Sequence, residues 1–479
     1  MDQEDELAEV EVRLRDVNAS IARLKREQAS LQHRKDEILT SIREQEQNRQ
    51  VSLEPDWRSG SGFPWSDILV KIARDTFGFN YLRAGQLEVM NASLSGYDVF
   101  SIMKTGGGKS LCYQLPALFA PEGFSLVVCP LLALIRDQVR LINEIQAGSA
   151  LSLAGTMERA EQNTVYKAMD TSRMRLLYVT PEKVIKSKLL MTHLQRAYDR
   201  GHLNSIVIDE AHCASQWGHD FRPDYAKLHV LRTVFPSVPL LLLTATANQT
   251  VRQDITEMLG LGSAGFKTFV GDFDRPNLVF EVRRKPRDFA RCVDMVRAAL
   301  PEPETGNAIV YCFSQKECTQ VAEALLERGV SAAPYHAGLS DYYRESYQDD
   351  WVGGRVQVIC ATIAFGLGIN MPSVRLVMHF TLSKSLELYY QEAGRAGRDG
   401  DPARCILLYA PDDVLRIASM AVHEVDKDPG GGGRTRPKVL SMIKYCQAKI
   451  CRRQLFAQTL DTATESDYGV PDFSIRCCA

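Results

Sequence analysis

The chain has 479 residues, a length typical of two or three domains, and its composition is that of an ordinary globular protein. Its net charge is −2 at pH 7, so any nucleic-acid-binding surface has to be a local patch and not an overall property of the chain. Most of the twelve cysteines lie singly in apolar runs, as in reduced intracellular proteins, and no run reaches the roughly 18 apolar residues of a membrane span, which argues against a disulfide framework and against a membrane protein.

Residues 1–50 show a heptad pattern. Apolar side chains recur at alternating three- and four-residue steps, at Leu7, Val10, Leu14, Val17, Ile21, Leu24, Leu31, Ile38 and Ile42. Gln28 and Lys35 interrupt this seam at core positions. We expect a long helix with two alternative roles. It forms a coiled coil that makes the protein a homo-oligomer or binds a partner, or it lies as a single amphipathic helix on its own protein.

The middle of the chain predicts an α/β fold. After a linker at 51–65, short apolar runs alternate with helical patterns from 66 to 272, with strands expected at 97–102, 125–129, 175–179, 204–208 and 239–243. A second series follows from 273 to 425, with strands expected at 307–312, 356–360, 375–379 and 404–409. Such alternation indicates two lobes, each a parallel sheet flanked by helices. A Gly-rich spacer at 426–437 precedes a last segment, 438–479.

A Gly-rich loop follows the first expected strand and precedes a helical pattern. Residues 103–110 read Met-Lys-Thr-Gly-Gly-Gly-Lys-Ser, with Met103 where the full phosphate-loop template has its first Gly. In this pattern the Lys109 side chain reaches the terminal phosphates of ATP and the Ser110 hydroxyl binds Mg²⁺. The backbone N–H groups that cradle the phosphates belong to the residues before them, Thr105, Gly106, Gly107 and Gly108.

Two further patterns complete an ATP site. Asp209 and Glu210 end an apolar run, and there Asp209 can hold the metal while Glu210 orients or deprotonates the attacking water. Upstream of the loop, Arg83 and Gln86 stand where motors of the helicase type often place a Gln that reads the adenine edge. A surface Gln is the alternative for Gln86. The patterns together favour an ATP-hydrolysing motor, with ATP in the cleft between the lobes.

In the second lobe, residues 391–400 carry Arg395 and Arg398, three positions apart among glycines. On one helical turn both side chains can face the cleft and neutralise charge that develops on the transferred phosphoryl group. Solvated arginines on a surface helix are the alternative.

The segment directly after residues 209–212, which read Asp-Glu-Ala-His, is a candidate for DNA contact. It contains Gln216, Trp217, His219, Phe221 and Arg222, and aromatic rings beside an arginine can stack on the bases of single-stranded DNA. Ordinary core aromatics are the alternative for Trp217 and Phe221. Small hydroxyl residues at strand ends, in 180–182 and 244–247, can bind DNA phosphates or relay the nucleotide state to the sheet.

Taken together, the motifs resemble the RecQ family of superfamily 2 DNA helicases, over roughly residues 64–455 and closest to its short vertebrate members. The resemblance is carried by residues 105–110, 178–182, 209–225, 244–247, 275–278, 311–314, 335–339 and 391–400. It implies two RecA-like lobes, ATP-driven 3′-to-5′ translocation on single-stranded DNA, and unwinding of forked or branched duplexes. The implied enzyme is thus also an isomerase that acts on DNA strands. It also implies a nuclear protein of DNA repair, recombination and replication, with Arg398 and Arg395 as arginine finger.

Several positions depart from the family pattern. Lys104 stands where a Pro is usual, Asn370 replaces a common Asp, and the block before Gln86 reads Leu-Arg-Ala-Gly. The family usually adds a four-cysteine zinc module and a winged helix. Here Cys451 matches the first zinc ligand, the later ones are absent, and the end resembles a shortened product. Another Zn²⁺ set remains open, formed by Cys446, Cys451, Cys477 and Cys478.

Three functions stay open at this point. The first is an active DNA-dependent ATPase and helicase, and the second is a truncated ATPase or DNA-binding form without efficient unwinding, which the missing zinc ligands favour. The third is an RNA helicase, which shares the motor fold but not the segment 216–222.

Overall fold

The computed structural model describes residues 55–83, 85–155, 157–171, 173–215, 221–261, 266–362, 371–417 and 432–459, together with residues 31, 34 and 365. Of the predicted N-terminal helix, only Leu31 and Arg34 are described, and both are helical and exposed. The rest of that segment and residues 460–479 lie outside the described residues, so the coiled coil stays a prediction. For the helical stretch 432–437 only the backbone is described.

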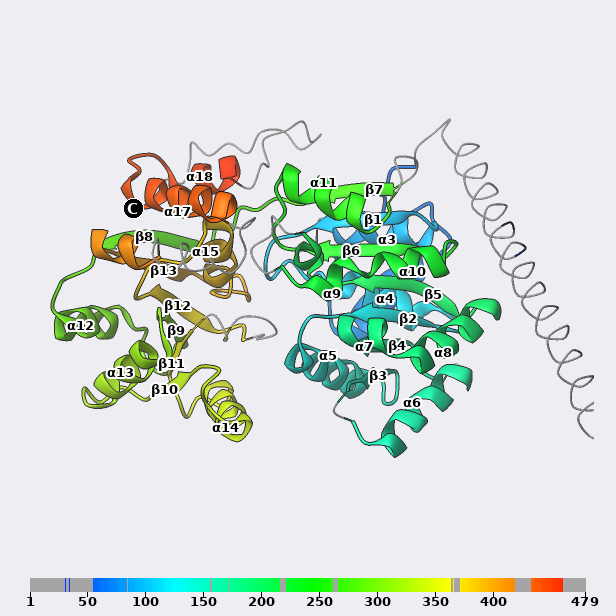
Figure 1. Cartoon of the computed structure of the whole chain (residues 1–479), viewed down its shortest axis with the longest axis horizontal. Helices are drawn as coiled ribbons and strands as arrows, with labels where there is room; N and C mark the ends of the chain where they lie inside the picture. The colour runs from blue at the N-terminus through cyan, green and yellow to red at the C-terminus, as the bar shows by residue number, and fades with distance from the viewer. Residues whose placement is uncertain are drawn as a thin grey trace, which may run out of the picture.

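The first lobe is built on a seven-stranded parallel sheet with strand order β3-β4-β2-β5-β6-β1-β7 (Figure 1, right). Its strands are β1 (Asp98–Ile102), β2 (Phe124–Val128), β3 (Ala150–Leu153), β4 (Leu176–Val179), β5 (Leu203–Ile208), β6 (Leu240–Thr244) and β7 (Phe266–Val270). The inner strands consist largely of Leu, Val and Ile because both faces of the sheet are covered by helices.

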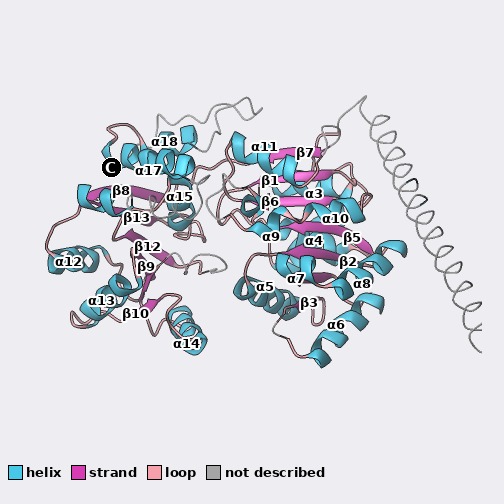
Figure 2. Ribbon diagram, in the orientation of Figure 1, coloured by secondary structure: helices cyan, strands magenta, loops and turns pink. Residues whose placement is uncertain are grey.

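Helices cover both faces of this sheet (Figure 2). Side chains alternate along each strand, so Val127 belongs to the cluster under α2–α5, whereas Leu126 and Val128 pack on the opposite side with α6, α8, α10 and α11. These elements are α2 (Ser66–Phe77), α3 (Gln86–Leu94), α4 (Leu111–Phe119), α5 (Leu132–Ile145), α6 (Arg159–Thr171), α7 (Pro181–Lys186), α8 (Lys188–Asp199), the 3₁₀ helix η1 (Ala211–Ala214), α9 (Pro223–Ala226), α10 (His229–Val234) and α11 (Gln249–Met258).

The second lobe is built on a six-stranded parallel sheet with strand order β10-β11-β9-β12-β13-β8. Its strands are β8 (Leu278–Arg284), β9 (Asn307–Tyr311), β10 (Ala332–Tyr335), β11 (Val358–Ala361), β12 (Val374–His379) and β13 (Ala403–Tyr409). The helices are α12 (Phe289–Ala299), α13 (Gln315–Leu326), α14 (Asp341–Val352), α15 (Leu386–Ala393), α17 (Gly432–Gln447) and α18 (Arg452–Thr459). The chain therefore passes from one sheet to the other between Val270 and Leu278.

The two parallel sheets confirm the predicted α/β fold with two lobes. Every strand expected from the sequence is present as an inner strand of one of the sheets. The strands that the sequence analysis missed are the outermost ones, β3 and β7 in the first sheet and β10 and β8 in the second.

The C-terminal helices α17 and α18 pack on α15 through a cluster of aromatic rings. Phe456 of α18 lies between Tyr389, Tyr390 and Tyr445, with ring centroids 6.0, 5.2 and 5.2 Å away, and it also packs on Phe280 of β8. Because α17 begins at Gly432, residues 432–437 of the expected spacer are helical, and the helical pair α17 and α18 is joined to the second lobe.

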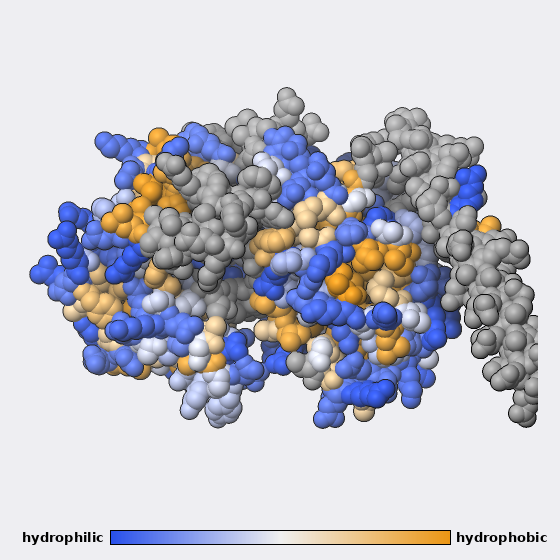
Figure 3. All heavy atoms as spheres, viewed as in Figure 1, coloured by the Kyte–Doolittle hydropathy of each residue, from blue (hydrophilic) through white to orange (hydrophobic). Residues whose placement is uncertain are grey.

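No zinc site is present in the described part of the chain, where no group of three or more His, Cys, Asp or Glu side chains could hold a metal ion. Cys446 is buried and Cys451 is half-buried, whereas Cys477 and Cys478 lie outside the described residues. None of the helices described is both long and apolar enough to span a bilayer. The visible surface is largely hydrophilic, with smaller hydrophobic areas (Figure 3).

Candidate nucleotide-binding site

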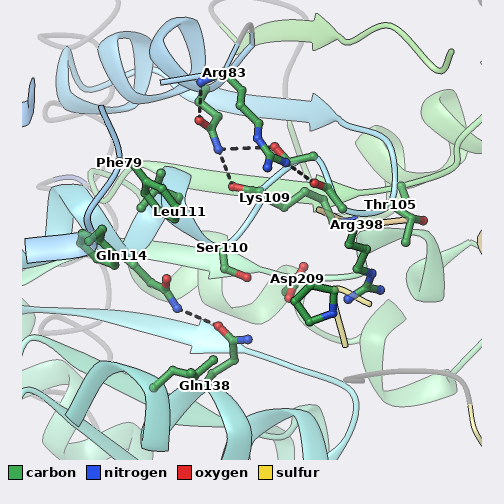
Figure 4. A pocket seen from close by; sticks show the side chains of 18 of the residues that line it. Phe79, Arg83, Thr105, Lys109, Ser110, Leu111, Gln114, Gln138, Asp209 and Arg398 are labelled. Atoms are coloured by element: carbon green, nitrogen blue, oxygen red, sulfur yellow. Dashed lines mark hydrogen bonds between the residues drawn. The ribbon is translucent and has the colours of Figure 1, made fainter. Parts of the chain in front are cut away.

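A cavity of about 770 Å³ lies where the two lobes meet, which is within the range of ligand sites. The first lobe contributes the Gly-rich loop and the acidic pair, and the second lobe contributes Pro372, Gln391, Arg395, Arg398 and Asp399. Figure 4 shows Lys109, Ser110, Asp209 and Arg398 around the same space. The structure brings together all the residues that the sequence assigned to ATP, namely Arg83, Gln86, Thr105, Gly106, Gly107, Gly108, Lys109, Ser110, Asp209, Glu210, Arg395 and Arg398.

The Gly-rich loop connects the end of β1 to the start of α4, so it lies at a helix N-terminus, where backbone N–H groups favour an anion. Gly108 has φ +81°, a left-handed conformation that glycine adopts without strain. A Cβ atom at this position would lie 2.3 Å from Nε2 of Gln86. Residue 108 therefore has to be glycine for two separate reasons, its backbone conformation and the close approach of Gln86.

Gln86 and Arg83 hold the loop from the side. The Gln86 amide nitrogen donates to the carbonyl of Gly108 at 3.1 Å, and its oxygen accepts from the backbone N–H of Arg83 at 2.7 Å. The Arg83 guanidinium donates to the carbonyl of Gly106 at 2.5 Å. Gln86 is buried, so the alternative of a surface Gln is wrong.

Aromatic side chains that the sequence analysis did not single out line the same cavity. They are Phe77, Phe79 and Tyr81, just before Arg83, and both Phe79 and Tyr81 are exposed. The available signal was the run Phe-Gly-Phe-Asn-Tyr at 77–81, directly upstream of the Gln86 block.

The acidic pair lies at the carboxyl end of β5. Asp209 accepts a hydrogen bond from the backbone N–H of Glu210 at 2.9 Å, and the Tyr225 hydroxyl donates to the Asp209 carbonyl at 2.9 Å. Burial and the neighbouring Glu210 raise the pKa of Asp209 to about 7, an effect that Lys109 opposes. Glu210 has φ +51° and is the one non-glycine residue in the described ranges with a left-handed backbone.

The donor set fits Mg²⁺. This ion takes oxygen ligands, and beside bound phosphates it needs only one or two carboxylates from the protein. Asp209 and the Ser110 hydroxyl are such ligands in the same cavity, and the raised pKa of Asp209 means that its buried charge lacks full compensation without a cation.

Three arginines converge on the loop from the other side. Arg395 and Arg398 follow α15, and the Arg275 guanidinium donates to the carbonyl of Thr105 at 3.0 Å and to those of Ala396 and Gly397 at 2.8 and 2.6 Å. Burial, Arg395 and Arg275 together lower the pKa of Arg398 to about 9. Positive charges concentrated in this way form a site for an anion such as phosphate.

A path of polar contacts runs from the acidic pair to the second lobe. Nδ1 of His212 lies 3.3 Å from the Glu210 carboxylate and 2.9 Å from the Thr244 hydroxyl. The Thr246 N–H donates to the same hydroxyl at 3.3 Å, and the Gln391 amide donates to the Thr246 side chain at 3.0 Å. Thr244 and Thr246 thus lie in a chain of polar contacts between the acidic pair and the second lobe.

The candidate DNA segment is placed only in part, because Gln216, Trp217 and His219 lie outside the described residues. Phe221 is exposed and is not a core aromatic. The Arg222 guanidinium donates to the carbonyl of Pro130 at 2.6 Å. This end of the segment is thus attached to the loop after β2.

The sequence analysis assigned no role to Arg275 or Gln391, although both lie in blocks that carried the family resemblance. Their contacts join the lobes at the cavity. Such a role cannot be read from the residue type alone, since it depends on which backbone groups come close in the fold.

Two domain families match this chain. Residues 83–254 match the family described as DEAD/DEAH box helicase, and residues 291–400 match the one described as helicase conserved C-terminal domain. The two matches lie within the first and second lobes, respectively.

Curated relatives match almost the whole chain. ATP-dependent DNA helicase Q-like 2 of Arabidopsis thaliana is 42% identical over 483 residues, which cover 98% of this chain and 66% of the plant protein. ATP-dependent DNA helicase Q1 of Rattus norvegicus is 40% identical over 473 residues, covering 97% of this chain and 74% of the rat protein. RecQ-like DNA helicase BLM of Xenopus laevis is 44% identical, covering 86% of this chain and 30% of the frog protein. The chain thus spans only part of each relative.

Solved structures of similar fold share much less sequence. The helicase MrfA bound to DNA has a TM-score of 0.61 at 18% identity, covering 76% of this chain and 53% of MrfA. Dbp5 of S. cerevisiae bound to RNA and ADP BeF3 has a TM-score of 0.56 at 18% identity, covering 74% of this chain and 89% of Dbp5. These likenesses concern the fold alone. With the relatives above, the family is clear: the chain belongs to the RecQ family of helicases.

Proposed function

We propose that this protein is an ATP-dependent DNA helicase, which hydrolyses ATP to translocate 3′ to 5′ on single-stranded DNA and to unwind forked or branched duplexes. One observation carries the proposal: the phosphate loop and acidic pair of one lobe face the arginines of the other lobe across a single cavity. A site divided between two lobes changes shape when they move, so hydrolysis can be coupled to motion along DNA. A nuclear role in DNA repair, recombination and replication is part of this proposal.

The roles of the residues in hydrolysis follow from their positions. Lys109 binds the β- and γ-phosphates, and the loop N–H groups hold the phosphate chain. Mg²⁺, held by Ser110 and Asp209, would neutralise negative charge on the phosphates when bound. Glu210 orients the attacking water and accepts its proton, and Arg395 and Arg398 stabilise the charge that develops on the γ-phosphoryl group.

The adenine end of the nucleotide belongs beside the aromatic side chains that line the cavity. Phe79 and Tyr81 are exposed aromatic side chains that line the cavity, and Gln86 lines it as well and bonds the loop. Stacking on an aromatic ring would hold the base. A base bound by Gln86 would also affect Gly108, because the Gln86 amide donates a hydrogen bond to the Gly108 carbonyl. Gln86 would thus affect both adenine recognition and the loop.

The DNA strand belongs near the segment that follows the acidic pair. Phe221 is exposed, and Arg222 is attached to the loop after β2, so a base stacked on this segment would be close to Asp209 and Glu210. Gln216, Trp217 and His219 remain candidates for the same contact.

The test is ATP hydrolysis by the purified chain, measured with and without single-stranded DNA, with single-stranded RNA of the same sequence in parallel. We expect strong stimulation by DNA and little by RNA, whereas preferential stimulation by RNA would contradict the proposal in favour of an RNA helicase. A forked duplex with one labelled strand then measures unwinding. Stimulated hydrolysis without strand separation would indicate the alternative, an ATPase form without efficient unwinding.

A further inference from the structure

The segment between the two sheets, residues 274–278, is contacted by the C-terminal helix α18. We propose that Arg453 of α18 is a positioning residue for ATP hydrolysis. It fixes the backbone of residues 274–278, here called the junction, and thereby the side chain of Arg275. Arg275 in turn joins the Gly-rich phosphate loop to the turn of residues 394–398, which carries Arg395 and Arg398. The proposal rests on the ATPase function proposed above. It gives the C-terminal helical pair, α17 and α18, a role in catalysis.

Arg453 binds the junction with both ends of its guanidinium group. Nη1 forms an ion pair with Asp274 and donates to the carbonyl of Arg275 at 2.9 Å. Nη2 donates to the carbonyl of Leu278 at 2.7 Å and to that of Pro276 at 3.4 Å. Arg453 is 9% exposed, so these contacts are shielded from water and hold the junction firmly.

The same junction reaches the ATP cavity at two points. The Lys104 ammonium, which stands where the family usually has proline, donates to the carbonyl of Asp274 at 2.6 Å. The Arg275 side chain bonds Thr105 of the loop and Gly394, Ala396 and Gly397 beside the two arginines. Any shift of the junction backbone therefore moves the phosphate loop relative to Arg395 and Arg398.

The helix that carries Arg453 is itself well anchored. Phe456, one turn further along α18, packs on Phe280 at 5.0 Å and on Tyr390 at 5.2 Å between ring centroids. The Tyr390 hydroxyl in turn donates to the carbonyl of Phe273, just before the junction, at 2.6 Å. Arg453 is thus held at a fixed position relative to β8 and α15.

Arginine is needed here because of its shape. A lysine would keep the positive charge opposite Asp274, but its single nitrogen cannot reach both the Arg275 and the Leu278 carbonyls, which the two terminal nitrogens of the guanidinium group bind. Arg453→Lys therefore removes the bridge with little change in charge.

The experiment compares steady-state ATP hydrolysis, at saturating single-stranded DNA, for the wild-type chain, Arg453→Lys and Arg452→Lys. We expect Arg453→Lys to lower kcat roughly tenfold with a smaller change in the KM for ATP, because arginines misplaced by a fraction of an ångström lose transition-state contacts. Arg452→Lys is the matched control on the same helix. Its side chain bonds the Tyr445 carbonyl and lies over the Tyr445 ring, away from the junction, so kcat should hardly change.

Further outcomes decide between positioning and simple destabilisation. Asp274→Asn weakens the same ion pair by changing the partner of Arg453. Its effect on kcat and that of Arg453→Lys should therefore be less than additive in the double variant. A folded Arg453→Lys chain with normal kcat, or equal losses in the Arg452 and Arg453 variants, would overturn the proposal. An inactive wild type would overturn the proposed function as well, which distinguishes the two failures.

Discussion

Gln86 and Glu210 show how individual residues are constrained by the site. Both amide atoms of Gln86 are engaged by backbone groups of the block 83–108, and Glu210 has a left-handed backbone directly after the buried Asp209. A strained conformation at such a position is maintained only when the surrounding structure determines it. The site therefore depends on backbone geometry as much as on the chemistry of its side chains.

Substitution of the phosphate-binding Lys or the acidic residue tests the catalytic assignment. We expect Lys109→Ala and Glu210→Gln each to abolish ATP turnover, because the first removes the positive charge on the phosphates and the second removes the proton acceptor. Glu210→Gln should still bind a fluorescent ATP analogue, whereas Lys109→Ala should bind it weakly. Near-normal hydrolysis by either variant would show that the site is wrongly assigned.

Gly108→Ala tests the close approach of Gln86 to the loop. A left-handed alanine costs roughly 1–2 kcal/mol, and here its Cβ also collides with Gln86, so the KM for ATP should rise about tenfold or more. Gly148 is a matched control, since its φ is +77° and a Cβ there meets nothing within 4 Å. Equal KM values for Gly108→Ala and Gly148→Ala would exclude the steric explanation.

At the scale of secondary structure, the inner strands could be predicted and the outer ones could not. Strands covered on both faces need largely apolar runs such as Phe-Ser-Leu-Val-Val of β2. Outer strands have weaker patterns: β7 is only half-buried, and β10 contains Pro334, which lacks a backbone donor and is tolerated at an edge. Lys109, Asp209 and Arg398 were predictable because the chemistry demands their residue types. The roles of Arg275 and Arg453 were not predictable, because both side chains bind main-chain carbonyls. Every residue has such a carbonyl, so the sequence does not show which ones they contact.

The helix α14 provides a prediction about stability. Most of its side chains are polar, and Trp351, which packs on Phe365 with ring centroids 5.5 Å apart, is fully buried. Trp351→Ala should lower the free energy of unfolding of the second lobe by about 3–5 kcal/mol because it leaves a large cavity. The neighbouring Val352 is half exposed, and Val352→Ala should cost only about 0.5 kcal/mol. Urea denaturation followed by circular dichroism measures both, and similar losses would contradict the packing argument.

On the scale of the whole molecule, the cavity is completed only where the two lobes meet. Arg275 and Gln391 provide direct hydrogen bonds across this boundary, to Thr105 and Thr246. Polar bonds of this kind can break and re-form when the lobes move relative to one another. This is the property expected of a motor whose nucleotide site opens and closes in each cycle.

The bond between Gln391 and Thr246 should contribute to coupling between the lobes. We expect Gln391→Ala and Thr246→Val each to reduce DNA-stimulated ATP hydrolysis, and the double variant to lose no more than the stronger single one. The coupling energy of such a buried hydrogen bond is about 0.5–1.5 kcal/mol. A double-mutant cycle on kcat/KM measures it, and full additivity would show that the bond carries no coupling.

The heptad pattern of residues 1–50 predicts self-association. Deletion of this segment should lower the oligomeric state, since its apolar seam would no longer be available to a second copy. Light scattering of the full chain and the shortened chain at equal concentration tests this. An unchanged molar mass would favour a single helix that lies on its own protein.

The contacts of Arg275 have a consequence for tolerance to mutation. All of the oxygen atoms that it binds at Thr105, Gly394, Ala396 and Gly397 belong to the main chain. Replacement of an acceptor side chain does not remove the carbonyl that Arg275 binds, whereas replacement of Arg275 removes every donor. Gly397 is restricted for a different reason, since it has φ +54° and a Cβ atom there would lie 2.5 Å from the Asn277 side chain and 2.7 Å from the Asp401 carbonyl. The hydrogen bonds therefore restrict the side chain at the donor position 275, while the restriction at Gly394 and Gly397 comes from the lack of space around these two glycines.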